Sequence, residues 1–108
     1  MGFNMQKLMK QAQKMQQDVA KAQEELQGAR VEGQSGGGMV RVVASGQQDI
    51  LSISIAPEVI DPDDVEMLED LVLAAIRDAL QNSRELMADR MSQATGGMNM
   101  GNLPGGFL

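Results

Sequence analysis

The stretch that decides the fold is residues 39–56, which read MVRVVASGQQDILSISIA. Apolar residues recur at every second position over residues 40–44 and again over residues 51–55, and β-branched residues dominate both runs, as strands favour. The five residues from Ser45 to Asp49 include a glycine and supply the connecting turn. We therefore predict a β-hairpin at the centre of the chain.

A third strand precedes this hairpin. Residues 30–35 can form a shorter strand, and the three glycines at positions 36–38 can turn the chain into the next one. A three-stranded sheet is marginal on its own, and its edges must be covered or paired. Because a chain of 108 residues buries only part of its surface, oligomerisation is a common remedy. We expect this β-unit, about residues 30–56, to dimerise.

A long helix is expected before the β-unit, from about residue 3 to residue 27. Asn4 could cap this helix and Gly28 could end it. About 24 residues at roughly 1.5 Å each give a rod near 36 Å, so the helix should project or pair along its length. Its apolar residues follow the unbroken 3-4 spacing of a heptad seam. The seam consists of Met5, Leu8, Ala12, Met15, Val19, Ala22 and Leu26.

A second long helix is expected after the β-unit, from about residue 62 to residue 94. Asp61 would cap it, with Pro62 in the first turn. The fold class is therefore α+β, with the order αβββα in a single domain of residues 1–95. Residues 96–108, rich in Gly and Met, are predicted to be a disordered tail.

Composition excludes several kinds of chemistry. The sequence holds no Cys and no His, which removes disulfides, thiolate nucleophiles, most zinc sites and the usual acid–base residue of neutral-pH catalysis. We expect no enzymatic activity, cofactor, metal or small-molecule substrate. No apolar run reaches the roughly 18 residues that span a bilayer. We therefore expect a cytoplasmic protein that does not associate with a membrane.

One glycine-rich stretch and one acidic stretch could suggest binding sites, but each has a structural explanation. A phosphate-binding P-loop needs Gly-Lys-Ser/Thr after its gap, whereas Met39 and Val40 follow Gly38. Carboxylates gather over residues 58–70, but the ligand spacing of a calcium loop is missing. Negative charge at the start of a helix explains them, because the helix dipole favours it there. They are Glu58, Asp61, Asp63, Asp64, Glu66, Glu69 and Asp70.

The net charge of −6 conceals a segregation of charge. Residues 1–17 contain three lysines and no acid, whereas residues 58–70 contain seven acids and no base. Lys7, Lys14 and Lys21 share one heptad position, with Lys10 beside them, and all point away from the seam. This stripe is either a phosphate-contacting edge or an ordinary solvated face. Three strands between two helices reverse the chain, so the start of the first helix and the end of the second should emerge on the same side. Lys7, Lys10 and Lys14 would then lie near Arg84 and Arg90 of the second helix.

The order of these features resembles the YbaB/EbfC family of nucleoid-associated proteins. The most specific matches are Met5–Gln13, Val31-Glu32-Gly33 leading into Gly36–Val40, and Ile53-Ser54-Ile55 before Pro57. Further matches are Glu66–Leu71, Ala74-Ala75, Asp78-Ala79, Thr95-Gly96-Gly97 and the Leu-Pro-Gly-Gly-Phe end. The resemblance covers nearly the whole chain, from Met5 to the C-terminus.

The resemblance implies a tweezer-like homodimer whose β-units join into a body and whose helices project as arms. It also implies binding of double-stranded DNA with low sequence preference, association with the nucleoid and a role in gene regulation. DNA contacts would come from Lys7, Lys10, Lys14, Lys21, Arg84 and Arg90, and the dimer interface from Val40, Val42, Leu51, Ile53 and Ile55. The alternative is a protein–protein adaptor that uses the Met-rich helix faces.

Overall fold

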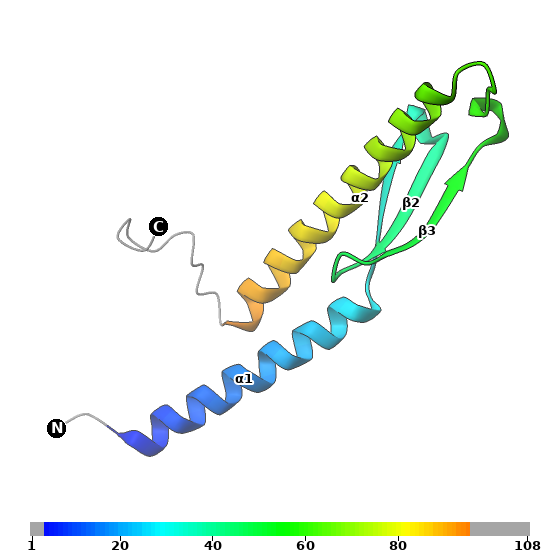
Figure 1. The fold of residues 1–108 in the computed structure, drawn as a ribbon. Helices are drawn as coiled ribbons and strands as arrows, with labels where there is room; N and C mark the ends of the chain where they lie inside the picture. Colours follow the sequence, from blue (N-terminus) through cyan, green and yellow to red (C-terminus); the bar gives the residue numbers. More distant parts are fainter. Residues whose placement is uncertain (1–3, 96–108) are drawn as a thin grey trace, which may run out of the picture.

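The fold is α+β with the predicted αβββα order, as a computed structural model describes it over residues 4–95 (Figure 1). The predicted tail, residues 96–108, lies outside the described residues. The elements are α1 (Met5–Gly28), β1 (Arg30–Ser35), the short 3₁₀ helix η1 (Gly36–Gly38), β2 (Val40–Ser45), β3 (Ile50–Ile55), the 3₁₀ helix η2 (Pro57–Val59) and α2 (Val65–Ala94).

The helix α1 begins where a side-chain cap is available. Asn4 has extended backbone angles, and its Oδ1 accepts a hydrogen bond from the backbone N–H of Lys7 at 3.2 Å. This is the geometry of an N-cap, so the predicted capping role of Asn4 is confirmed. Gly28 is the last residue of the helix, and Ala29 leads directly into β1.

The start of α2 corrects one prediction. Asp61 does not cap the helix, because its Oδ1 accepts from the N–H of Asp63 at 2.9 Å and closes a local turn instead. The cap is Asp64, whose Oδ1 accepts from the N–H of Met67 at 3.1 Å. The helix therefore begins at Val65, three residues later than predicted, and Pro62 lies before it.

The three strands form one antiparallel sheet in the order β1-β2-β3. The predicted glycine turn is present between β1 and β2, where Gly36, Gly37 and Gly38 all have positive φ values of 59°, 67° and 93°. Gly33 lies opposite Val42, which in turn lies opposite Ile53. A bulge after Val43 lets Ser52 and Ile50 pair with consecutive residues of β2, so Leu51 is the extra residue.

The core lies between the sheet and α2. Val40, Val42 and Ala44 of β2 are fully buried, as are Ala75 and Ala79 of α2. A Cβ atom on Gly33 would lie only 2.7 Å from Ala79 Cα and closer still to Ala79 N and Ala75 O. Small residues on both sides therefore let the helix approach β1 as closely as backbone atoms allow.

This close approach blocks one edge of the sheet. Asp78 Oδ2 accepts from the backbone N–H of Gln34 at 3.0 Å, and Asn82 Nδ2 donates to the carbonyl of Glu32 at 2.8 Å. Both backbone groups belong to the outer edge of β1, so side chains of α2 occupy that edge. Within residues 4–95, α2 makes no corresponding hydrogen bond to β3.

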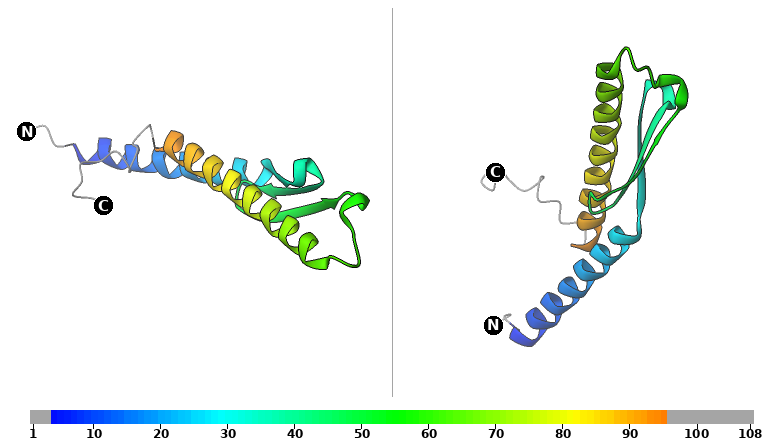
Figure 2. Two further views of the ribbon diagram at one scale, coloured as in Figure 1. Left: turned by 90° about the horizontal axis from the view of Figure 1, so that it is seen from above. Right: turned by 45° about the vertical axis from the view of Figure 1, so that its right-hand side comes forward.

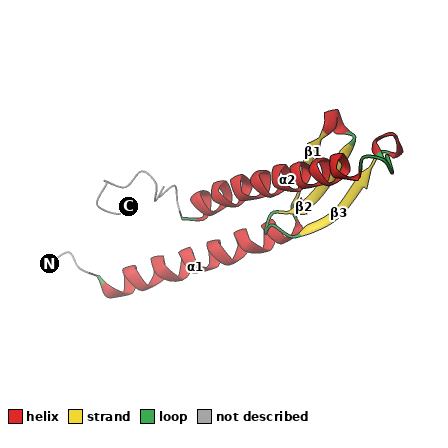
Figure 3. Cartoon of the chain, turned by 45° about the horizontal axis from the view of Figure 1, so that its top comes forward, coloured by secondary structure: helices red, strands yellow, loops and turns green. Residues whose placement is uncertain are grey.

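The two long helices leave the β-unit toward the same end of the molecule, as predicted (Figures 1 and 3). They do not run together to their tips, because the N-terminal half of α1 continues past the end of α2 (Figure 2). The result is an elongated chain measuring 76 × 31 × 16 Å.

Replacing Gly33 by Ala should destabilise the protein by about 1–3 kcal/mol, because the added methyl group has no room beside α2. Urea unfolding at a fixed protein concentration measures the change. Gly28→Ala is the matched control, since a Cβ there meets no atom within 4 Å and Ala favours the helix, so stability should stay constant or rise by up to about 1 kcal/mol. Equal stability of the Gly33→Ala variant and the native chain would contradict this packing.

Candidate nucleic-acid interface

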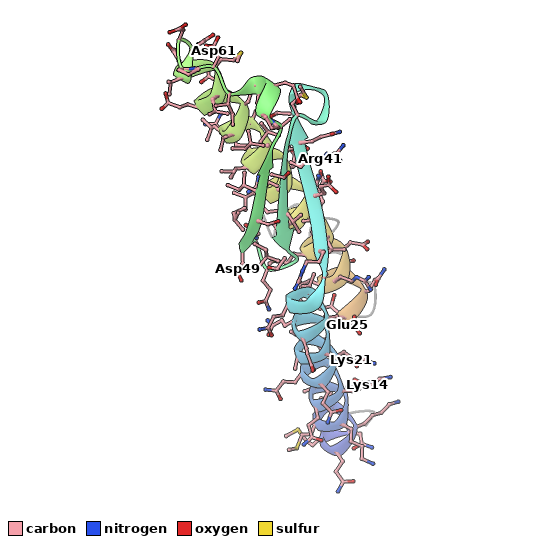
Figure 4. The ribbon with its side chains drawn as sticks, turned by 90° about the vertical axis from the view of Figure 1, so that its right-hand side faces the viewer. Lys14, Lys21, Glu25, Arg41, Asp49 and Asp61 are labelled. Carbon is pink, nitrogen blue, oxygen red and sulfur yellow. The ribbon has the colours of Figure 1, made fainter. Side chains whose placement is uncertain are left out.

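The candidate interface is the projecting half of α1, where three lysines are exposed. Lys7, Lys10 and Lys14 are all exposed and precede the first acidic residue of the helix, Asp18. Figure 4 shows Lys14 and Lys21 on the same side of α1. We call residues 4–17, which comprise the N-cap and the outer half of α1, the basic tip.

Acidic residues gather at the opposite end of the molecule. Figure 4 shows Asp61 at the end of the β-unit remote from Lys14. The seven acids of residues 58–70 are all exposed there, around η2 and the first turns of α2. Since the chain is 76 Å long and the Debye length near physiological salt is about 8 Å, the acidic end does not cancel the field at the basic tip.

The base of α1 is fixed to the turn between β2 and β3. The Leu26 side chain is 1% exposed, and the Leu26 carbonyl accepts from the backbone N–H of Gly46 at 2.9 Å. Gln47 Nε2 donates to the carbonyl of Gln23 at 3.0 Å. A Cβ on Gly46 would lie 2.7 Å from the Leu26 carbonyl oxygen, so glycine is needed for this contact. These contacts fix the C-terminal end of α1 to the β-unit, while the residues of the basic tip remain exposed.

The end of α2 meets the C-terminal half of α1. A shallow groove of about 170 Å³ lies between them, and Lys21, Ala22 and Arg90 are among its lining residues. Arg90 Nη1 lies 3.9 Å from Glu25 Oε2, with both side chains about half exposed. An exposed ion pair at that distance contributes little stability, but it offsets part of the Arg90 charge.

The groove brings Arg90 to Lys21 and not to the three lysines that were predicted to lie near it. Arg90 lies beside Lys21 in the groove, whereas Lys7 lies 14 residues, or roughly 21 Å of helix, farther out. Arg84 is exposed, and its spacing from the buried Ala75, Ala79 and Ser83 puts it on the far face of α2. Arg84 and Arg90 therefore do not form one surface with the basic tip. The reason is that α1 diverges from α2 and extends past it.

The predicted dimer residues also separate into two groups. Val40 and Val42 are fully buried beneath α2 of their own chain, so they have no surface to offer a second copy. Leu51 and Ile53 are 47% and 45% exposed, while Ile55 is half-buried against the core. The alternating apolar residues of β2 predict that one face of the strand is buried, but not which element buries it. In the structure α2 of the same chain buries it.

Sequence reasoning missed the side chains that distinguish the two sheet edges. Asp78 and Asn82 are four residues apart on α2, so they share a face of the helix and both reach β1. Ile50, 39% exposed, also adds to the apolar surface along β3. The spacing of Asp78 and Asn82 beside the buried Ala75 and Ala79 is the signal that could have identified them.

Two kinds of feature are absent from the part of the chain that the structure describes, a metal-holding cluster and a membrane-spanning helix. Among residues 4–95 no three acidic residues are grouped so that they could hold a metal ion. Nor does either long helix have a stretch apolar enough to cross a bilayer. The buried Ser83 hydroxyl donates to the Ser45 carbonyl at 2.7 Å, so it has a structural role.

Comparison with known proteins points in one direction. The profile of the YbaB/EbfC DNA-binding family matches residues 1–98. A nucleoid-associated protein of Desulforamulus reducens is 59% identical over 103 residues, which cover 95% of this chain and 98% of that protein. One from Caldanaerobacter subterraneus subsp. tengcongensis is 55% identical over 102 residues, covering 94% of this chain and 92% of that protein.

The fold is also found in a solved structure. The crystal structure of an uncharacterized protein from Helicobacter pylori superimposes with a TM-score of 0.69 and covers 87% of this chain and 96% of that one. The two sequences are 20% identical, so this match bears on the fold alone.

Proposed function

The chain belongs to the YbaB/EbfC DNA-binding family, and we propose that it is a nucleoid-associated protein that binds double-stranded DNA as a homodimer through the basic tips of its α1 arms. The contacts are made mainly to phosphates and carry little sequence preference. The protein acts by binding and not by catalysis, and it contributes to nucleoid organisation and gene regulation.

The observation that carries this proposal is the exposed lysine stripe on a helix that projects free of the body. Lys7, Lys10 and Lys14 present ammonium groups with no acid among residues 4–17. Lysine is a flexible point charge suited to phosphate oxygens, whereas bidentate readout of guanine favours arginine. Uniform binding to the phosphate backbone is therefore the expected mode.

The other three basic residues of the predicted DNA contact contribute less. Arg90 shares its charge with Glu25 at the base of the arm, and Arg84 faces away from it. Lys21 lies near Asp18 and Glu25 in the same groove. The strength of the grip therefore rises from the base of α1 toward its tip.

The open edge of β3 supports the homodimer. The hydrogen bonds of Glu32 and Gln34 with α2 show that these two residues of β1 direct their backbone groups away from β2. Backbone groups alternate in direction along antiparallel strands, so the register places the N–H and C=O of Ile53 on the side of β3 that faces away from β2. The Ile53 side chain is 45% exposed because α2 covers β1 and β2. An unpaired strand with exposed apolar residues is a template for another strand, and β3 of a second copy would extend the sheet.

Binding should weaken steeply as salt rises. If about five phosphates are neutralised by the arms of a dimer, the logarithm of the association constant should fall against the logarithm of salt concentration with a slope near −4.5. A gel-shift titration over a salt series measures the slope. No binding at low salt, or a flat response, would contradict a phosphate grip and favour the adaptor function.

Neutralising two lysines of the basic tip removes up to four charges per dimer, so the slope should become shallower by about 3.6 and binding should weaken for all sequences alike. The variant is Lys10→Gln with Lys14→Gln. Arg41→Gln with Arg77→Gln is the matched control, because it changes net charge equally at exposed positions on the body of the molecule. Equal effects of the two pairs would mean that net charge alone governs binding.

Placing a charge on the open edge should separate the dimer. Ile53→Lys puts an ammonium group where the two β3 strands would bring their apolar side chains together, so light scattering should report the monomer mass at micromolar concentration. Ser52→Lys adds the same charge to the opposite face of β3 and should remain a dimer. Retention of the dimer by both variants would show that β3 is not the interface.

A further inference from the structure

The heptad seam of α1 changes environment halfway along the helix. At the base, Ala22 and Leu26 are buried, and Val19 is half-buried. Farther out the same seam is uncovered, with Met5 60%, Leu8 45% and Met15 42% exposed. Met9, next to the seam, is 60% exposed. The inner half of this apolar stripe therefore packs within the chain, whereas the outer half contacts no other described element.

We propose that the outer half of this seam, Met5 to Met15, is a docking surface for the same seam of a second copy of the chain. The 3-4 spacing is the pattern by which two helices interlock side chains along their length. The inner half already packs within the chain at Ala22 and Leu26, so pairing of the outer halves continues an existing contact. The proposal does not depend on DNA binding.

The charge pattern around the seam favours this occupant. Positions that flank a paired seam face the flanking positions of the other helix, and like charges there repel. Over residues 4–17 these flanking residues are uncharged. They are Asn4, Met9, Gln11 and Gln16.

The lysines take the remaining positions. Lys7 and Lys14 are two residues after a seam residue, and Lys10 lies opposite the seam. Two tips can therefore pair while every lysine of the basic tip points outward. A bilayer surface suits this helix less well, because its lysines face away from the apolar stripe and would not lie beside it at the headgroups.

The contact between two tips is small, so it depends on a high local concentration of chains. A symmetric pairing of two β3 edges is antiparallel, so it points the two α1 arms of a pair in opposite directions. Seam contacts then join one pair of chains to the next, and several weak contacts acting together hold such an assembly. DNA can bind the outward lysines of the paired tips.

Disulfide cross-linking tests this contact directly, because the sequence contains no cysteine of its own. Ala12→Cys puts one thiol at the centre of the exposed seam, and Gln17→Cys puts one on the opposite, equally solvated face. Under mild oxidation without DNA, the Ala12→Cys chain should form a species of twice the chain mass at least about tenfold faster than the Gln17→Cys chain. Equal rates, or no cross-link from Ala12→Cys, would overturn the proposal.

A second pair of variants separates this contact from DNA binding. Leu8→Ser with Met15→Ser in the Ala12→Cys chain should reduce cross-linking to the rate of Gln17→Cys, with helix content in circular dichroism checking the fold. Persistent cross-linking in that chain would exclude the seam. Lys10→Gln with Lys14→Gln should leave cross-linking unchanged, so a failure of the phosphate grip and a failure of seam pairing give different results.

Discussion

The close packing of α2 against β1 is the constraint on which the rest of the molecule depends. Gly33 lets the backbone of α2 lie directly on the strand, with Ala75 and Ala79 as the facing residues. That approach puts Asp78 and Asn82 within hydrogen-bond distance of the outer edge of β1. It also centres α2 on β1 and β2, so β3 retains an uncovered apolar face and an open edge.

The same packing directs both helices. Ser83, the next residue of the buried stripe on α2, donates to Ser45, and the turn that follows Ser45 holds Leu26 at the base of α1. The two helices therefore leave the β-unit at one end, and α1 continues outward beyond α2 (Figure 2). Seven of the fifteen acidic residues lie at one end of a 76 Å chain, and Lys7, Lys10 and Lys14 lie at the other. A chain of net charge −6 can present a positive surface because distance and salt screening separate the two ends.

Local features could be predicted from the sequence because short-range physics fixes them. The Asn4 cap, the glycine turn at positions 36–38 and the alternation of β2 depend on neighbouring residues, and the structure has all three. Asp61 and Asp64 both have the chemistry of a cap, and only the course of the chain after Pro57 decides between them. The burial of Val42 depends on how far α2 extends across the sheet. The separation of Lys7 from Arg90 depends on how the two helices diverge. Those are long-range consequences of packing, which no local pattern contains.

The central claim is that the outer lysines of α1 contact DNA, and the chain offers a direct measurement of it. Its only four lysines are Lys7, Lys10, Lys14 and Lys21, all on α1. Acetylation of amines, followed by mass spectrometry, therefore modifies no side chain outside this helix. With saturating duplex DNA, the rates at Lys7, Lys10 and Lys14 should fall well below those of the free protein, and Lys21 should change less. Unchanged rates at all four lysines, under conditions where DNA is bound, would contradict the account.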